Sequence, residues 1–182
     1  MAKQLWVSAE GTESWEKRKG NVTAALEAGA DAIVVNSGEG AKAKQLGKIK
    51  VIGEDVQAKF IEIKNKEDEL RAAKEACSGT VVVSTTDWKV IPLENLIAAK
   101  QKKSGTLIAR VSSVGDAKLA LEALEIGVDG VLFDGKASDI KRVKELIEKM
   151  NRGLAGHYRC EEPLPGQSLS RAPILPSKAI KA

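Results

Sequence analysis

The feature that most constrains the fold is a regular alternation of short apolar, β-branched runs with helical patterns over the first 150 residues. Seven runs are predicted to be strands, at residues 5–7, 32–35, 50–52, 60–63, 81–83, 106–111 and 130–133. Every run except the third is followed by a helical pattern. Strands that are apolar throughout and alternate with helices predict an α/β protein with a parallel sheet. This alternation alone does not distinguish a closed barrel from an open doubly wound sheet.

Apolar spacing predicts which face of each helix packs on the sheet. Two patterns recur at intervals of three and four residues, namely Val114, Ala117, Leu121 and Leu124, and Ile140, Val143, Ile147 and Met150. For the third helix, the face is predicted to contain Leu70, Ala73 and a buried thiol at Cys77. Ser113, with Asp116 three residues later, is a capping-box pattern, and Ser138 is the predicted cap of the last helix.

Residues 25–34 and 123–132 resemble each other almost position by position. Each segment ends a helix with glycine, at Gly29 or Gly127, and then passes through an aspartate into a strand. Glycine at this position favours a left-handed helix cap. These joints lie at the amino ends of strands, opposite the face where α/β barrels bind ligands. We therefore expect a shared packing geometry here rather than a shared ligand.

The composition changes near residue 151. Residues 151–182 contain four of the five prolines, and they carry five basic against two acidic side chains, so most of the net charge of +4 lies there. We predict an α/β, barrel-like, catalytic-type domain at residues 1–150 and a Pro-rich irregular tail at 151–182. The nearly neutral body offers no basic stripe for nucleic acid.

Several functional classes are disfavoured by composition. His157 is the one histidine, which rules out a histidine cluster for a metal, and two widely separated cysteines do not make a disulfide scaffold. No apolar run approaches the ~20 residues that a transmembrane helix needs. The amino terminus enters a strand directly and lacks a signal-peptide pattern. The expected location is therefore the cytoplasm, with no metal, nucleic-acid or membrane partner.

The most informative motif follows the valine run 81–83. It places Thr86, Asp87, Trp88 and Lys89 directly after a buried strand, and Pro92 and Glu94 at the expected start of the next helix. The carboxyl ends of parallel strands are where α/β proteins build their sites. Arg110 and Asp134 stand at the corresponding ends of two later strands.

This segment, TTDWKVIPLEN, resembles the archaeal-type (type II) 3-dehydroquinate synthases. The opening LWV, the stretch Trp15-Glu16-Lys17-Arg18 and residues 46–52 carry the same resemblance, which covers roughly residues 3–150. Several separated motifs recur in order, which makes the likeness specific. It favours a TIM-barrel-like and incomplete fold, because the resembled enzymes continue beyond this point with a β-rich region. An eighth strand is expected after the last helix, and residues 151–182 do not supply a convincing one.

The resemblance implies a reaction. These enzymes use NAD to deaminate 2-amino-3,7-dideoxy-D-threo-hept-6-ulosonate oxidatively, and they cyclise the product to 3-dehydroquinate for aromatic amino-acid biosynthesis. The partner implied is this small amino-keto sugar acid, and a homo-oligomer is compatible with the sequence. Because the chain is short, its own activity is left open.

The same resemblance, with position after the strand, suggests site residues. Asp87 and Glu94 are candidates for proton transfer and Lys89 for an electrophilic or imine-forming amine. Thr86, Asn95 and Arg110 are candidates for substrate binding. Each has a structural alternative: Asp87 as a cap, Lys89 as a solvated lysine, Glu94 as a surface acid that complements the helix dipole, Arg110 as a strand end.

The residues that hold NAD are not identified. Residues 38–43, Gly-Glu-Gly-Ala-Lys-Ala, fit a G-x-G-x-x-A turn, but Glu39 places a negative charge where phosphates would lie. A plain strand-to-helix turn is the alternative. Two other functional classes also remain, a non-catalytic α/β association domain and an unrelated phosphate-sugar barrel enzyme.

Overall fold

The structure is a computed structural model, and it describes residues 2–85, 93–101, 103–123 and 126–156. All seven predicted strands form. They are β1 (Gln4–Ala9), β2 (Ala32–Val35), β3 (Lys50–Val51), β4 (Lys59–Glu62), β5 (Thr80–Ser84), β6 (Thr106–Val111) and β7 (Gly130–Phe133). The six helices are α1 (Trp15–Glu27), α2 (Gly40–Leu46), α3 (Lys66–Glu75), α4 (Leu93–Lys100), α5 (Val114–Glu122) and α6 (Ala137–Gly156).

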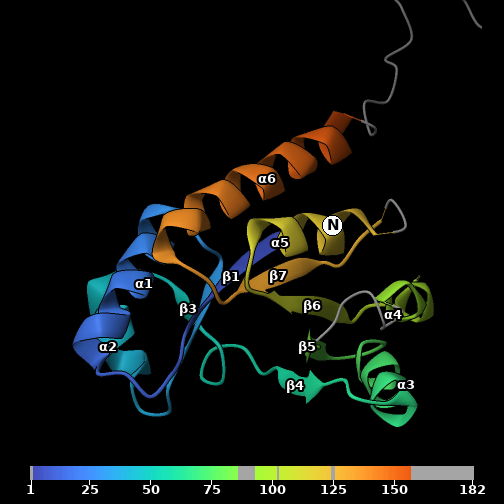
Figure 1. The fold of residues 1–182 in the computed structure, drawn as a ribbon, viewed down its shortest axis with the longest axis horizontal. Helices are drawn as coiled ribbons and strands as arrows, with labels where there is room; N and C mark the ends of the chain where they lie inside the picture. The colour runs from blue at the N-terminus through green and yellow to red at the C-terminus, as the bar shows by residue number, and fades with distance from the viewer. Residues whose placement is uncertain (1, 86–92, 102, 124–125, 157–182) are drawn as a thin grey trace, which may run out of the picture.

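The strands form one parallel sheet in the order β3-β2-β1-β7-β6-β5-β4 (Figure 1). This is the order of a barrel in which β7 has joined β1 and the sheet is interrupted between β3 and β4. The TIM-barrel-like, incomplete fold is therefore confirmed. Val7 pairs with Phe133, so β7 lies directly beside β1. The stretch after α6, where an eighth strand was expected, lies outside the described residues.

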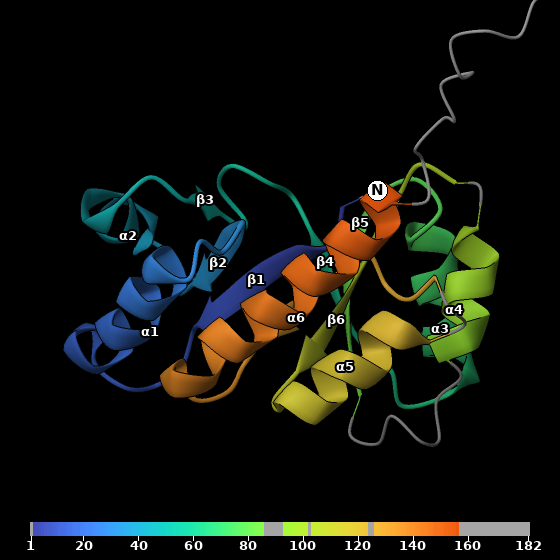
Figure 2. The same ribbon diagram turned by 90° about the horizontal axis from the view of Figure 1, so that it is seen from above.

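Burial shows that the helices pack on one face of the sheet. The larger core joins alternate strand residues, such as Leu5 and Val7, to apolar side chains from all six helices. Helices α1, α6 and α5 run side by side across this outer face (Figure 2). A doubly wound sheet carries helices on both faces, so this arrangement selects the barrel type that the alternation had left open.

The inner face of the sheet has its own small core. Trp6, Val34, Val82, Ile108 and Leu132 project from five strands and are buried together. Val56 and Ala58, in the connection between β3 and β4, pack against them. This connection therefore covers part of the inner face on the side where the barrel is interrupted.

The repeated helix-to-strand joints have the shared geometry that was expected. Gly29 and Gly127 both have positive φ, +69° and +64°. Asp31 accepts a hydrogen bond from the backbone N–H of Leu5 at 2.8 Å, and Asp129 accepts one from Leu107 at 2.7 Å. In each case the aspartate before a strand binds the adjacent, earlier strand, so the repeat serves packing.

Two predictions for the third helix, its buried face and the burial of Cys77, were wrong. On α3, Leu70 is 61% exposed, and Glu69, Ala72 and Ala76 form the buried face instead. Ala72 and Ala76 lie on one helix face and Ala73 lies on the neighbouring one, so the spacing of apolar residues did not distinguish the two faces. Cys77 is accordingly half-buried, in the turn after the helix.

The ends of two other helices test the cap assignments. Ser113 caps α5 as predicted, accepting the backbone N–H of Asp116 at 3.1 Å. Ser138 lies inside the first turn of α6, which begins at Ala137, so it is not the cap.

Helix α6 continues through Gly156, past the predicted start of the tail. Within it, the Asn151 side chain accepts the Lys3 N–H at 2.7 Å and donates to the Lys3 carbonyl at 3.1 Å. The end of α6 is thereby attached to the beginning of β1. Residues 157–182 lie outside the described part of the chain.

Candidate functional site

Polar side chains gather at the carboxyl ends of the strands, on the inner face of the sheet. Successive strand residues point to opposite faces, and Val82 and Ile108 belong to the inner core. The residues two positions later therefore share that face. With their equivalents on β1, β4 and β7, the inner polar set is Ser8, Glu62, Ser84, Arg110 and Asp134. We call this set the mouth of the incomplete barrel.

Arg110 and Asp134 form the charged pair of the mouth. Arg110 donates to Asp134 Oδ2 from Nε at 3.0 Å and from Nη2 at 2.5 Å. Both side chains are more than a third exposed, at 34% and 41%. An exposed pair of this kind is held weakly in water, and the guanidinium retains further donors. Arg110 therefore lies at the strand ends with donors to spare and with Asp134 as its anion, and carboxylate binding by it stays a prediction.

Ser8 is a buried member of the mouth, next to the end of β1. Its register partner on β2 is Val34, and the pairing of Val7 with Phe133 places Ser8 beside Asp134 in the next step along β7. Ser8 is 3% exposed. Its Oγ has no hydrogen-bond partner among the described residues.

The residues predicted after β5 are only partly described. Thr86, Asp87 and Lys89 lie outside the described residues, so their roles stay predictions. Glu94 is exposed in the first turn of α4. The position agrees with either a proton-transfer group or a surface acid, and the prediction stays open.

Asn95 is engaged between two helices. Its amide donates to Glu69 Oε1 on α3 at 3.2 Å. Glu69 also accepts a hydrogen bond from Lys66 at 2.7 Å, and this contact, more than Asn95, lowers the pKa of Glu69. Asn95 thus helps to hold α4 against α3, and substrate binding by it stays a prediction.

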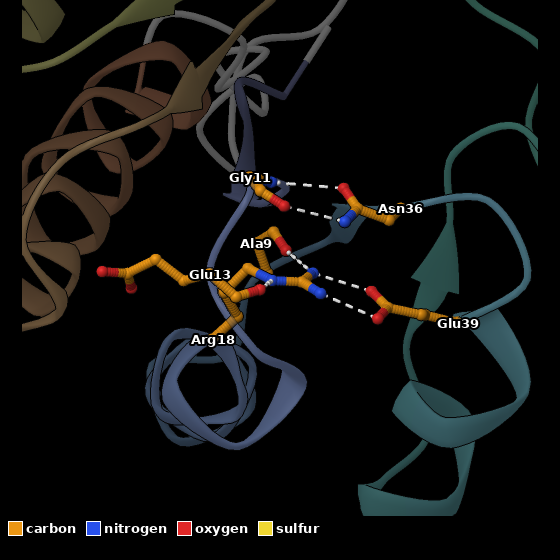
Figure 3. Close-up of polar contacts among 6 residues, drawn as sticks. All are labelled: Ala9, Gly11, Glu13, Arg18, Asn36 and Glu39. Carbon is orange, nitrogen blue, oxygen red and sulfur yellow. Dashed lines mark hydrogen bonds and ion pairs between the residues drawn. The ribbon is translucent and has the colours of Figure 1, made fainter.

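Sequence reasoning missed an ion pair beside the mouth. Arg18 is 6% exposed and forms a two-bond contact with Glu39, each N···O distance being 2.7 Å (Figure 3). Its guanidinium also donates to the carbonyls of Ala9 and Glu13 at 2.8 Å. The pair joins the end of β1 and the loop after it to the start of α2. Arg18 follows Trp15 by three positions and precedes Val22 by four, and a cation on an apolar helix face was the available signal.

A second contact joins the same two loops. The Asn36 amide donates to the Gly11 carbonyl at 2.9 Å, and its oxygen accepts the Gly11 N–H at 3.2 Å (Figure 3). The carboxyl ends of β1 and β2 are therefore fixed relative to each other. This rigidity positions Ser8, which lies one residue before the end of β1.

The glycine turn at residues 38–43 does not fit the pyrophosphate of a dinucleotide. The Glu39 carboxylate is bound to Arg18 at the start of α2, and the contact with Arg18 lowers the pKa of Glu39, so it stays charged. A Cβ added at Gly40 would lie 2.0 Å from a carboxylate oxygen of Glu54. Two carboxylates surround the position that phosphates require. The structure supports the strand-to-helix turn, stabilised by the ion pair.

The opposite, amino end of the inner face holds a cavity of about 320 Å³. Gln4, Trp6, Lys50, Thr80 and Thr106 are among its lining residues. None of the predicted site residues that the structure describes lies there. Across the described residues, no three histidine, cysteine or acidic side chains come together as metal ligands, and no helix has the length and apolar character of a membrane span.

Comparisons with known proteins follow the same residues. Residues 2–149 match the model of the 3-dehydroquinate synthase II N-terminal domain. The 3-dehydroquinate synthase of Archaeoglobus fulgidus is 37% identical over 147 residues, covering 81% of this chain and 43% of the relative. That of Methanocaldococcus jannaschii is 36% identical, covering 81% and 48%. A 3-dehydroquinate synthase homolog of Aquifex aeolicus is 41% identical, covering 84% and 46%. The chain thus spans somewhat less than half the length of these relatives.

Proposed function

Because the chain belongs to the 3-dehydroquinate synthase II family, we propose that it forms the amino-terminal, barrel-like part of an enzyme that makes 3-dehydroquinate. The match of residues 2–149 to the amino-terminal domain of that family carries this proposal. The relatives are named as enzymes, and the mouth of the barrel offers polar groups at the strand ends where α/β enzymes act.

The proposed reaction is that of the archaeal-type enzymes. The substrate is 2-amino-3,7-dideoxy-D-threo-hept-6-ulosonate, which loses its amine by oxidative deamination with NAD. The resulting diketone closes to 3-dehydroquinate when a carbon next to one ketone attacks the other. This places the protein among the oxidoreductases of the shikimate pathway, in the cytoplasm, with a homo-oligomer as the proposed assembly.

Ring closure makes three demands on the protein. A base removes a proton from the methyl ketone, and Asp87 or Glu94 is proposed for this step. A cation holds the substrate carboxylate, and Arg110 at the mouth suits it. Lys89 is the proposed electrophilic amine, while Thr86 and Asn95 are proposed donors to substrate oxygens.

NAD remains part of the proposal through the family alone. When bound, it would accept the electrons of the deamination. The glycine turn among the described residues does not fit its pyrophosphate, since Glu39 and Glu54 crowd that turn. No step is assigned to residues 38–43.

One alternative is a role without catalysis by this chain alone. A chain that covers 43–48% of relatives such as the two archaeal enzymes can instead be a non-catalytic α/β domain that associates with another polypeptide. The two proposals differ in turnover and not in fold.

The test is an absorbance assay for NADH formation with the amino-heptulosonate and NAD, with 3-dehydroquinate identified by mass spectrometry. The Archaeoglobus fulgidus relative serves as the positive control under the same conditions. Turnover that the double variant Asp87→Ala/Glu94→Ala loses supports catalysis by this chain. If the relative turns the substrate over and this chain does not, catalysis by this chain is contradicted and the association domain is favoured.

A further inference from the structure

Ser8 combines three properties that a purely structural serine rarely has. It is 3% exposed, its Oγ lacks a hydrogen-bond partner among the described residues, and it points into the inner face of the mouth. A buried hydroxyl without a partner keeps an uncompensated desolvation penalty. Buried polar groups are nearly always paired in native proteins, so each exception needs an explanation.

The neighbours of Ser8 do not supply that pairing. Val34 lies beside it on β2, and the adjacent inner-face residues Trp6 and Leu132 are apolar. The nearest charge by register is Asp134, which is bound to Arg110. The strands therefore fix the position of the Ser8 hydroxyl, and its hydrogen-bond partner is not one of the described residues.

We propose that Ser8 is a substrate-binding residue that hydrogen-bonds an uncharged oxygen, hydroxyl or ketone, of a small hydroxy-carboxylate whose carboxylate binds Arg110. The inference rests on the proposed function and extends it, because none of the predicted site residues lies on β1.

Burial decides which end of the ligand Ser8 contacts. Placing a carboxylate among Trp6, Val34 and Leu132 would desolvate a charge with one hydroxyl to compensate. Arg110 is a third exposed, so a carboxylate there keeps part of its water and gains a cation. The charged end of the ligand therefore binds at the more exposed Arg110 and an uncharged oxygen at the buried Ser8.

The test compares two carboxylates by calorimetry on the full chain. Quinate carries ring hydroxyls, and cyclohexanecarboxylate has the same ring and charge without them. For Ser8→Ala, we expect quinate affinity to fall about 3- to 10-fold, the value of one uncharged hydrogen bond. Cyclohexanecarboxylate affinity should not change. Equal quinate affinity in the variant and the native chain overturns the proposal.

Thr80→Val is the matched control. It removes a hydroxyl from the same inner face but at the amino end of β5, where the opposite cavity lies. We expect it to leave quinate affinity unchanged. An equal loss in Thr80→Val would show a general effect on the sheet and would overturn the assignment to Ser8.

Thermal unfolding without ligand gives the second readout. Since Ser8→Ala removes an unpaired buried hydroxyl, Tm should stay the same or rise. A lower Tm would mean that the hydroxyl stabilises the native state, and it would refute the proposal.

The inference and the proposed function can fail separately. Quinate binding that depends on Ser8, without turnover of the amino-heptulosonate, keeps the binding site and rejects catalysis. Turnover without any loss of quinate affinity in Ser8→Ala supports catalysis and rejects the binding role of Ser8. A native chain that binds neither quinate nor 3-dehydroquinate at millimolar concentration overturns the binding site.

Discussion

At the scale of single residues, the Arg18–Glu39 pair is the side-chain contact whose loss should lower the stability of the fold most. Arg18 makes four hydrogen bonds, two to Glu39 and two to backbone carbonyls, so its loss leaves several buried acceptors unpaired. Breaking a buried pair is strongly destabilising. We expect Arg18→Met to lower Tm by about 10 °C.

The control is a cation that forms ion pairs at the surface. Lys44 contacts Glu54 and Asp55, and its side chain is 40% exposed. Lys44→Met should change Tm by no more than ~2 °C. Equal losses in the two variants would contradict the special role of Arg18.

The same pair predicts a pH dependence. Arg18 lowers the pKa of Glu39, so the pair contributes stability above the ordinary glutamate pKa and loses it as pH falls through the lowered value. Native Tm should therefore fall as the pH drops below about 4. In Arg18→Met, the part of that fall due to Glu39 should be absent, which unfolding curves between pH 7 and pH 3 would show. A fall of the same size in both proteins would exclude Glu39 as a source.

At the scale of elements, the two repeated joints provide an internal comparison. Gly29 and Gly127 have nearly equal positive φ, but a Cβ at Gly29 meets open space, whereas one at Gly127 lies 1.9 Å from the Leu121 carbonyl oxygen. Gly29→Ala should cost about 1–2 kcal/mol from backbone strain alone. Gly127→Ala should cost clearly more, because the end of α5 must also move.

Denaturant unfolding at neutral pH measures both variants. The difference between them isolates the close approach, since the φ strain is common. Equal losses of unfolding free energy would mean that the joint before β7 relaxes without cost, against the packing described for Gly127.

At the scale of the whole molecule, the interruption between β3 and β4 sets the pattern of stability. β1 and β7 pair on both sides, whereas β3 pairs only with β2 and β4 only with β5. Hydrogen exchange should be slowest in β1 and β7 and much faster in β3 and in β4. Equal protection in β4 and β7, measured by NMR, would show that another chain covers this edge in solution.

Much of the fold followed from sequence because it depends on local chemistry. Continuous β-branched runs, glycine caps and Ser113 all act within a few residues, and they located seven strands and six helices. The family could also be recognised, since separated motifs recur in order. The buried face of α3 was misassigned because alanines contribute little to an apolar pattern. Leu70, the largest apolar residue of the helix, is exposed and not buried.

What only the tertiary structure decided concerns pairing between distant residues. The direct contact of β7 with β1, the gap between β3 and β4, and helices on one face depend on strand order, which no local pattern encodes. The Arg18–Glu39 pair and the unpaired Ser8 hydroxyl likewise appear only when β1, α1 and α2 are assembled. Local sequence determines where elements begin and end, because those interactions span a few residues. The packing of elements determines which polar groups find partners and which remain for a ligand.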